Sequence, residues 1–289
     1  MKLLIIGHSV VDHIINNESE IIKPGGIYYS AIGFNGVRKD DDEFFLLTSS
    51  SSEDEKYFKR LFNEFNLDFV NHLEKIPHVN LTVDDQFERR EHYQNLVEPL
   101  NLNDKIRWNE FDGVFVNMIT GNDLTAEDFI QIRKNFDGII YLDVHTLSRG
   151  VGKEHHRYFK KIPNYEKYLQ SVDIIQVNEH ELKTITPYDE KNEILKKVFE
   201  YDVKFIIITK GERGAEIFTK DSSFFSVDAI KVNSINKVGC GDVFGSVFFY
   251  LYLCGLNFEK SLIKANYTAG IITTYSSENE FLNLKNDII

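Results

Sequence analysis

The sequence has little cysteine and no cluster that could bind zinc. Cys240 and Cys254 are its two cysteines, and its nine histidines are scattered along the chain. An expected helix between the cysteines would hold them roughly 20 Å apart at about 1.5 Å per residue, too far for a disulfide bond. Neither the cysteines nor the histidines have the spacing of zinc ligands. These absences predict a protein of the reducing cytoplasm.

Positive charge and long apolar runs are also scarce. The formal net charge is −12, and no basic run occurs. Phosphate backbones are bound through clustered Lys and Arg, so the sequence predicts no nucleic-acid partner. No run of about 18 apolar residues is present, which predicts no membrane-spanning helix and no membrane partner. The 289 residues, 42% hydrophobic and 27% charged, have the composition of a soluble globular protein.

Two common phosphate-binding motifs are missing. A P-loop needs Gly-x-x-x-x-Gly-Lys-Ser/Thr, and no such string occurs. In the nearest match to the dinucleotide fingerprint Gly-x-Gly-x-x-Gly, Gly245 comes one residue late and Asp242 would face the pyrophosphate. Another kind of phosphate site has to be considered.

Short apolar runs alternate with amphipathic stretches along most of the chain. Expected strands cover residues 3–7, 44–48, 113–118, 138–143, 173–177 and 205–209. Expected helices cover residues 53–65, 126–136, 189–201, 242–254 and 258–275. This alternation predicts a doubly wound α/β fold with a mostly parallel sheet, whose ligands bind beyond the carboxyl ends of the strands. The candidates there are Asp12, Asn117, Asp143, Asn178 and Gly211.

Two polar segments interrupt this alternation, at about residues 13–29 and 68–100. Both carry β-branched and aromatic residues in loose alternation with polar ones. Such a pattern predicts a small β flap, or lid, attached to a single α/β domain over residues 1–289.

A glycine turn at residues 239–241 opens directly into an apolar helix. Unpaired amides and the positive dipole end at a helix start attract an anion, typically phosphate. Asp242 stands on the first turn, where bound phosphate would repel it. A carboxylate there suits a base that accepts a proton from a hydroxyl attacking phosphate. Asp242 could instead simply cap the helix.

With these motifs in order, the chain resembles the ribokinase-like (PfkB) carbohydrate kinases over nearly its whole length. The family signature Asp-Thr-x-Gly-Ala-Gly-Asp-x-Phe-x-Gly is similar to Asn-Lys-Val-Gly-Cys-Gly-Asp-Val-Phe-Gly at residues 236–245. The resemblance implies that Asp242 is the catalytic base and that the amides of Gly239, Cys240 and Gly241 form the anion hole. Asn236 replaces the usual aspartate, and the last glycine comes one place early.

Further matches assign the acceptor site. Asp12 follows the first strand, where the family binds substrate hydroxyls, and Gly25-Gly26 resembles the family turn that lets a sugar approach the backbone. We add Asn117 to the substrate-binding residues because it stands at a strand end. The glycine pair could also be a plain hairpin turn.

The donor side is implied by two more motifs. Thr209, Gly211 and Gly214 match the Thr-x-Gly-x-x-Gly segment of the nucleotide site, and Asn266 matches a polar residue beside the adenine. Asn178 and Glu181 match the Asn-x-x-Glu motif, which implies Mg²⁺ held mainly through water. Asn178 and Glu181 also have the spacing of a helix capping box.

The resemblance implies a kinase that transfers the γ-phosphoryl group of ATP to a hydroxyl of a small sugar or related polyol, with Mg²⁺, and that pairs as a homodimer through the lid. Ser30, and residues 49–55 after the second strand, depart from the family pattern and leave the acceptor open. Two alternatives remain: a nucleoside or cofactor-precursor kinase of the same fold, and a non-catalytic ligand-binding relative.

Overall fold

The computed structural model describes residues 1–16, 19–82 and 90–288. Within them the main sheet has eight strands in the order β16-β15-β14-β13-β10-β9-β1-β4. Neighbouring strands from β4 to β14 run parallel, whereas β15 is antiparallel to both β14 and β16. The strands are β1 (Lys2–Ile6), β4 (Glu43–Leu47), β9 (Gly113–Asn117), β10 (Ile139–Asp143), β13 (Ile174–Asn178), β14 (Phe205–Thr209), β15 (Ala215–Thr219) and β16 (Phe224–Val227).

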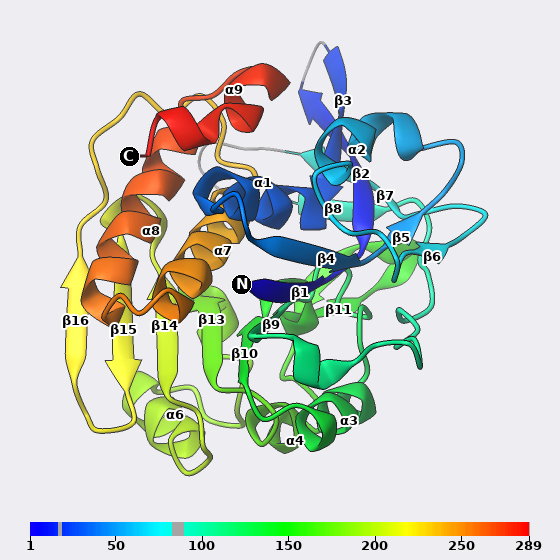
Figure 1. Ribbon diagram of the computed structural model, residues 1–289. Helices are drawn as coiled ribbons and strands as arrows, with labels where there is room; N and C mark the ends of the chain where they lie inside the picture. Colours follow the sequence, from blue (N-terminus) through cyan, green and yellow to red (C-terminus); the bar gives the residue numbers. More distant parts are fainter. Residues whose placement is uncertain (17–18, 83–89, 289) are drawn as a thin grey trace.

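Helices cover both faces of this sheet. Figure 1 shows α1, α7 and α8 on one face and α3, α4 and α6 on the other. The α-helices are α1 (Ile27–Val37), α2 (Glu55–Phe62), α3 (Ala126–Asn135), α4 (Tyr165–Leu169), α5 (Glu179–Leu182), α6 (Lys191–Val198), α7 (Cys240–Leu253), α8 (Phe258–Ile272) and α9 (Glu278–Leu282). Short 3-10 helices are η1 (Trp108–Glu110), η2 (His145–Ser148), η3 (Lys153–His155), η4 (Gly211–Arg213) and η5 (Leu284–Asn286).

The sheet is apolar on both faces because each face packs against helices. In β1 the residues Leu3 to Ile6 are fully buried, as expected for a central parallel strand. Helix α7 packs against both α1 and α8 and is therefore apolar nearly all round, with Phe248 and Phe249 fully buried. A large core fixes the first turn of α7 against the sheet. No helix in the described part of the chain is long and apolar enough to cross a bilayer.

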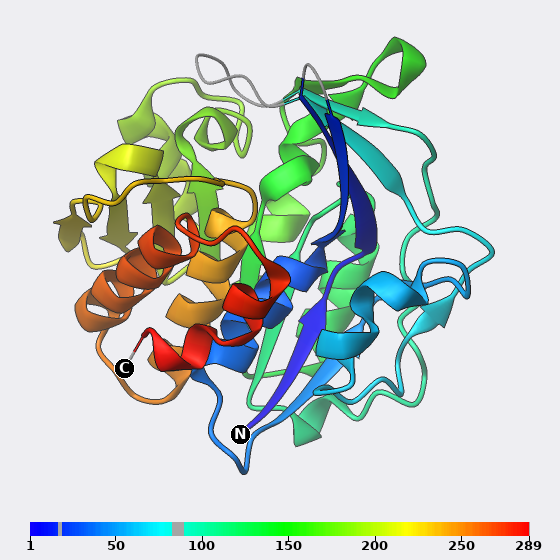
Figure 2. The same cartoon turned by 90° about the horizontal axis from the view of Figure 1, so that it is seen from above.

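A second sheet, in the order β3-β2-β7-β8, forms the lid. Its strands are β2 (Ser9–Asn16), β3 (Ser19–Gly26), β7 (His78–Thr82) and β8 (Arg90–Tyr93). The chain enters it from β1 through Gly7 and His8 alone. Seen from above, the lid and α8 lie on opposite sides of the molecule (Figure 2). Two further pairs are β5 (Ser49–Ser50) with β6 (Asn71–His72), and β11 (Arg149–Val151) with β12 (Arg157–Phe159).

The fold expected from the sequence is confirmed: a mostly parallel sheet between helices, with a small β lid. Each expected strand occurs with its ends within one residue, and each expected helix with its ends within three. The structure corrects the lid boundaries: β2 begins at Ser9, residues 27–29 begin α1, and β6 within the second segment pairs with β5 instead of joining the lid. Helix α1 is buried on nearly every side and therefore lacks the amphipathic period of a surface helix. Strands β15 and β16 were also not expected. Residues 17–18 and 83–89 of the two lid segments lie outside the described residues.

Candidate active site

In the turn before α7, position 239 has room only for glycine. Gly239 adopts φ 80°, a left-handed conformation that favours glycine, and a Cβ there would come within 2.2 Å of the Tyr29 ring. Cys240 and Gly241 follow as the first residues of the helix. The amides of Gly239, Cys240 and Gly241 therefore belong to the positive end of a 14-residue helix, an arrangement that can hold a phosphoryl group.

Asp242 is held towards the sheet. Its carboxylate is largely buried and accepts a hydrogen bond of 2.6 Å from Nδ2 of Asn117, the last residue of β9. The same amide nitrogen lies 3.1 Å from the Ser30 hydroxyl on α1. The N-cap of α7 is Gly239, which has no side chain to form a capping hydrogen bond, and Asp242 is the acidic residue of the first turn. Asn117 acts as a positioning group for this carboxylate.

Asp12 and the two glycines come together in the lid. Asp12 lies on β2, opposite β3, and is buried. A Cβ on Gly25 would come within 2.2 Å of the Asp12 carboxylate, so the glycine makes room for that carboxylate. Gly26 has φ 63° and is the N-cap of α1. The glycine pair therefore joins a strand to a helix, and the hairpin-turn alternative is wrong.

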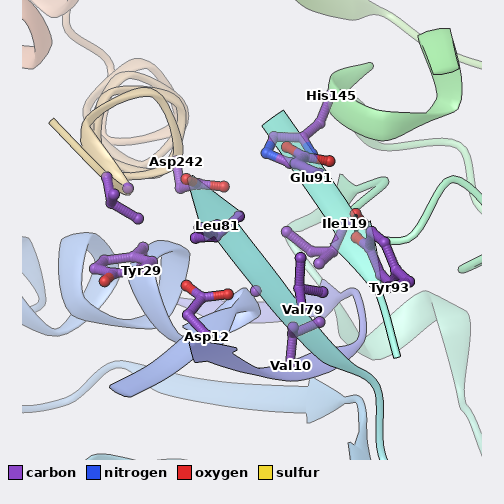
Figure 3. A pocket seen from close by; sticks show the side chains of 13 residues that line it. Val10, Asp12, Tyr29, Val79, Leu81, Glu91, Tyr93, Ile119, His145 and Asp242 are labelled. Atoms are coloured by element: carbon purple, nitrogen blue, oxygen red, sulfur yellow. Dashed lines mark hydrogen bonds between the residues drawn. The ribbon is translucent and has the colours of Figure 1, made fainter. Parts of the chain in front are cut away.

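Asp12 and Asp242 face one cavity, which Figure 3 shows between the lid and the start of α7. Its volume of about 30 Å³ holds about two waters. The lining residues are Val10, Asp12, Gly26, Tyr29, Val79, Leu81, Glu91, Tyr93, Ile119, His145, Val238, Gly239 and Asp242. One buried carboxylate thus comes from the lid and the other from the helix that carries the anion hole.

Three polar residues of this cavity were not expected from the sequence. Glu91 and Tyr93 come from β8, and His145 follows β10 with φ 38°. The Tyr93 hydroxyl donates to the Ile119 carbonyl at 3.0 Å, and burial raises the pKa of Tyr93 well above its ordinary value. His145 could have been found from its position, because it lies two residues after the carboxyl end of an expected strand. Glu91 and Tyr93 lie in a segment that the sequence assigned only to the lid.

A second layer of polar side chains supports the first turn of α7. Nε2 of Gln176 donates to Asp143 at 2.8 Å and to the Gly241 carbonyl at 3.0 Å. The Tyr141 hydroxyl donates to Oε1 of Gln176 at 2.6 Å. Burial, followed by the negative charge of Asp242, raises the pKa of Asp143 well above its ordinary value. Strands β10 and β13 thereby anchor the residues next to the catalytic candidate.

Asn178 and Glu181 form the capping box of α5. Oδ1 of Asn178 accepts from the amides of His180 and Glu181, and the two Glu181 oxygens accept from the Asn178 amide and Nδ2 at 2.8 Å each. Within residues 1–16, 19–82 and 90–288, no three His, Cys, Asp or Glu side chains are grouped to hold a metal ion. The amide and carboxylate are hard oxygen donors that suit Mg²⁺, and their mutual bonding suits contact through water.

The nucleotide candidates lie along β14, η4 and α8. Thr209 ends β14, and Gly214 has φ 85°, where a Cβ would come within 1.9 Å of the Val227 carbonyl. Gly211, with φ 56°, has open space around it. Nδ2 of Asn266 on α8 donates to the Asp228 carbonyl at 2.9 Å. Strands β15 and β16 pack against α8, so the four candidates belong to one edge of the molecule.

Known proteins resemble this chain in the motifs of the candidate site and in the overall fold. Residues 157–284, which carry the capping box, the η4 turn and the start of α7, match the model of the pfkB family carbohydrate kinases. This part of the chain is similar to the PfkB family. Two solved structures share the fold of the whole chain: a pyrophosphate-dependent kinase in the ribokinase family (17% identity, TM-score 0.81, 100% of both chains) and ribokinase from Thermotoga maritima (16%, 0.76, 99% and 97%).

Curated relatives match over shorter stretches. The 5-dehydro-2-deoxygluconokinase of Lacticaseibacillus casei is 25% identical over 118 residues, 40% of this chain and 36% of that protein. The deoxyribokinase of Salmonella typhi is 30% identical over 103 residues, 34% of this chain and 33% of that protein. The matched stretches span about a third of these relatives.

Proposed function

We propose that this protein is a kinase of the PfkB type that transfers the γ-phosphoryl group of ATP to a hydroxyl of a small sugar or related polyol. One observation carries the proposal: Asp242, on the first turn of α7, faces the same buried cavity as Asp12. A carboxylate beside an anion hole suits a general base, and a second carboxylate a few residues into the lid suits a group that holds hydroxyls.

In the proposed reaction, Asp12 and the Gly25-Gly26 backbone hold the acceptor with one hydroxyl at Asp242. The hydroxyl oxygen attacks the terminal phosphorus of the donor, the bond from that phosphorus to the bridging oxygen breaks, and Asp242 takes the hydroxyl proton. The amides of Gly239, Cys240 and Gly241 stabilise the charge on the transferred group. Asn117 keeps the Asp242 carboxylate in place through its 2.6 Å hydrogen bond.

The donor would lie along the nucleotide candidates Thr209, Gly211, Gly214 and Asn266. When bound, Mg²⁺ neutralises donor phosphates. Asn178 and Glu181 would hold the ion through water, because both Glu181 oxygens already accept hydrogen bonds from Asn178.

The lid has to move for a sugar to enter. A cavity of about 30 Å³ holds about two waters, whereas a sugar needs several times that space. We therefore propose that the β2-β3-β7-β8 sheet opens as a unit and closes over the acceptor, which limits transfer to water. Ile21 and Ile22 of β3 are each 43% exposed and would suit contact with a second subunit through the lid.

Pyrophosphate is a second candidate donor, favoured by the loop that precedes α7. The Asp228 carbonyl accepts a hydrogen bond from the side-chain amide of Asn266. A Cβ on Gly270 of α8 would come within 2.4 Å of Ile230, so the loop packs closely against α8. This loop thus covers the side of α8 where the adenine contact was expected. A pyrophosphate donor needs the anion hole without an adenine site, and one structural relative is pyrophosphate-dependent.

The test is a phosphorylation screen with purified protein and Mg²⁺. Sugars, polyols, nucleosides and cofactor precursors are incubated with ATP or with pyrophosphate, and product carrying one added phosphoryl group is measured by mass spectrometry. We expect product from a sugar or polyol with one donor, and none with the D242N variant. Product from nucleosides alone would favour the nucleoside-kinase alternative. Saturable binding without product would favour the non-catalytic alternative.

A further inference from the structure

Gln176 is a buried polar residue in the middle of an apolar strand. It lies on β13 between Ile175 and Val177, and only 3% of its surface is exposed. Central parallel strands that are covered on both faces are usually apolar throughout. A buried side-chain amide costs free energy unless it is hydrogen-bonded, so its partners show what it does there.

Each polar atom of the Gln176 amide has a partner. Nε2 donates to Asp143 at 2.8 Å and to the Gly241 carbonyl at 3.0 Å, and Oε1 accepts from the Tyr141 hydroxyl at 2.6 Å. Burial raises the pKa of Tyr141 well above its ordinary value, so this hydroxyl keeps its proton and donates. Turned over, the amide would set Oε1 against the Gly241 carbonyl, which cannot donate. The partners therefore allow one orientation of the side chain.

The bond to Gly241 acts on the first turn of α7. The Gly241 carbonyl and the amide of Asp242 belong to one planar peptide unit, so a bond that holds the carbonyl also holds the start of Asp242. Asn117 holds the other end of that residue through its hydrogen bond to the carboxylate. Asp242 is thus fixed at its backbone from β13 and at its carboxylate from β9.

Gly245 makes room for this contact. In an α-helix the Gly241 carbonyl pairs with the amide four residues later, which is that of Gly245. A Cβ on Gly245 would come within 2.7 Å of Oε1 of Gln176. Ser246 stands where the family signature has its glycine, and it fits because a Cβ on Gly33 of α1, which would clash with its hydroxyl, is missing. The early glycine of the motif therefore matches the glutamine beside it.

We propose that Gln176 is a positioning residue for phosphoryl transfer, and that Gly245 and Tyr141 keep it in place. It holds the first turn of α7 so that the anion-hole amides and the Asp242 carboxylate keep one arrangement during the transfer. The inference rests on the proposed kinase function and adds to it a residue that acts through Asp242. Misplacement of a reacting group by about 1 Å costs on the order of 100-fold in rate, so this role belongs to kcat.

The first test is Q176M, because methionine has a similar length and fills the same space but cannot donate a hydrogen bond. With the best acceptor from the screen we expect kcat to fall about 10- to 100-fold, with both KM values little changed. Y141F is a milder change that should lower kcat to a smaller extent, and it keeps the test open if Q176M does not fold. A wild-type kcat in both variants, or in Y141F alone if Q176M does not fold, would overturn the proposal.

Tyr250 gives a matched control on the same helix. Its hydroxyl donates to Asp42 at 2.6 Å, as that of Tyr141 does to Gln176, and both tyrosines are buried. Y250F therefore removes a comparable hydrogen bond near the other end of α7. We expect it to lose stability in urea unfolding about as Y141F does, but to keep its kcat. An equal loss of kcat in Y141F and Y250F would mean a general effect of lower stability and would overturn the proposal.

A double variant separates positioning from packing. G245A should lower both stability and kcat, because the new Cβ presses on Oε1 of Gln176, although alanine is otherwise favoured over glycine in a helix. In the Q176A background that contact is gone, so G245A should cost less stability there than in the wild type. The kcat of Q176A/G245A should stay as low as that of Q176A. Recovery of the wild-type kcat in the double variant would mean that Gln176 only fills space, and would overturn the proposal.

Hydrogen exchange without substrates separates this inference from the kinase function. The amides of residues 243–245 close the first turn of α7, that of Val243 on the Gly239 carbonyl at 3.0 Å. Measured by NMR, these amides should exchange faster in Q176M and Y141F than in the wild type, and at the wild-type rate in Y250F. Unchanged exchange in Q176M would overturn the proposal. If no acceptor gives product, the kinase function fails, whereas the exchange rates still decide whether Gln176 holds the turn.

Discussion

At the scale of single residues, Asp12 and Asp242 divide the work of the proposed site. Asp12 reaches the cavity from the lid, and we propose that it contacts the acceptor and not the donor. D12A should therefore raise the acceptor KM about 10- to 100-fold through loss of a hydrogen bond to a charged group, and leave donor affinity unchanged. Steady-state kinetics with each substrate varied measures both. Equal losses for donor and acceptor would mean that the variant disturbs the fold.

The buried His8, next to the first lid strand, makes the stability of the fold depend on pH. It is fully buried after β1, with Nδ1 2.9 Å from the Ser49 hydroxyl, and Nε2 has no partner within the described residues. Burial lowers its pKa below the ordinary value of 6.5, against the opposing charge of Asp123. Below pH 6.5 the unfolded chain therefore binds more protons at this residue than the folded protein does.

We expect the free energy of unfolding to fall as the pH drops below about 6.5, with a contribution from His8 of up to about 1.4 kcal/mol per pH unit. H8Q removes the titration, so its stability should depend less on pH. Urea unfolding of the wild type and of H8Q is measured at about pH 7.5, 6.5 and 5.5, values that bracket the ordinary histidine pKa. If the free energy of unfolding changed equally with pH in both proteins, the pKa of His8 would not differ between the folded and unfolded states.

At the scale of elements, glycines with positive φ mark the turns that shape the donor side. Gly214 and Gly255 have φ 85° and 89°, but a Cβ on Gly214 would come within 1.9 Å of the Val227 carbonyl, whereas Gly255 has open space. G255A should cost about 1–2 kcal/mol of stability from conformation alone. G214A should cost more and should separate β15 from β16. Equal losses in urea unfolding would contradict the role of the close contact.

The sequence predicted elements well where their pattern was local. The short apolar runs of β1, β9 and β14 located the parallel strands, and the glycine turn located α7. Strand β15 alternates buried and half-buried residues, as a strand with one covered face does. Helix α1 could not be recognised by periodicity, because burial on almost every side removes the polar face that defines an amphipathic helix.

At the scale of the whole molecule, the site joins parts of the chain that are distant in sequence. Asp242 was predictable because its glycine turn is contiguous, and the capping box of Asn178 was predictable from spacing. Glu91, Tyr93 and His145 were missed because only folding brings β8 and the end of β10 together.

The central claim is that Asp242 is the base in phosphoryl transfer, and D242N tests it most directly. The substitution preserves size and the contact with Asn117 but removes the proton acceptor. Asp202, fully exposed and paired with Lys220, gives the matched control D202N. With the best acceptor from the screen, we expect kcat of D242N to fall about 10²- to 10⁴-fold, with donor affinity equal or tighter, and D202N to remain unchanged. A kcat of D242N close to that of the wild type would contradict the account.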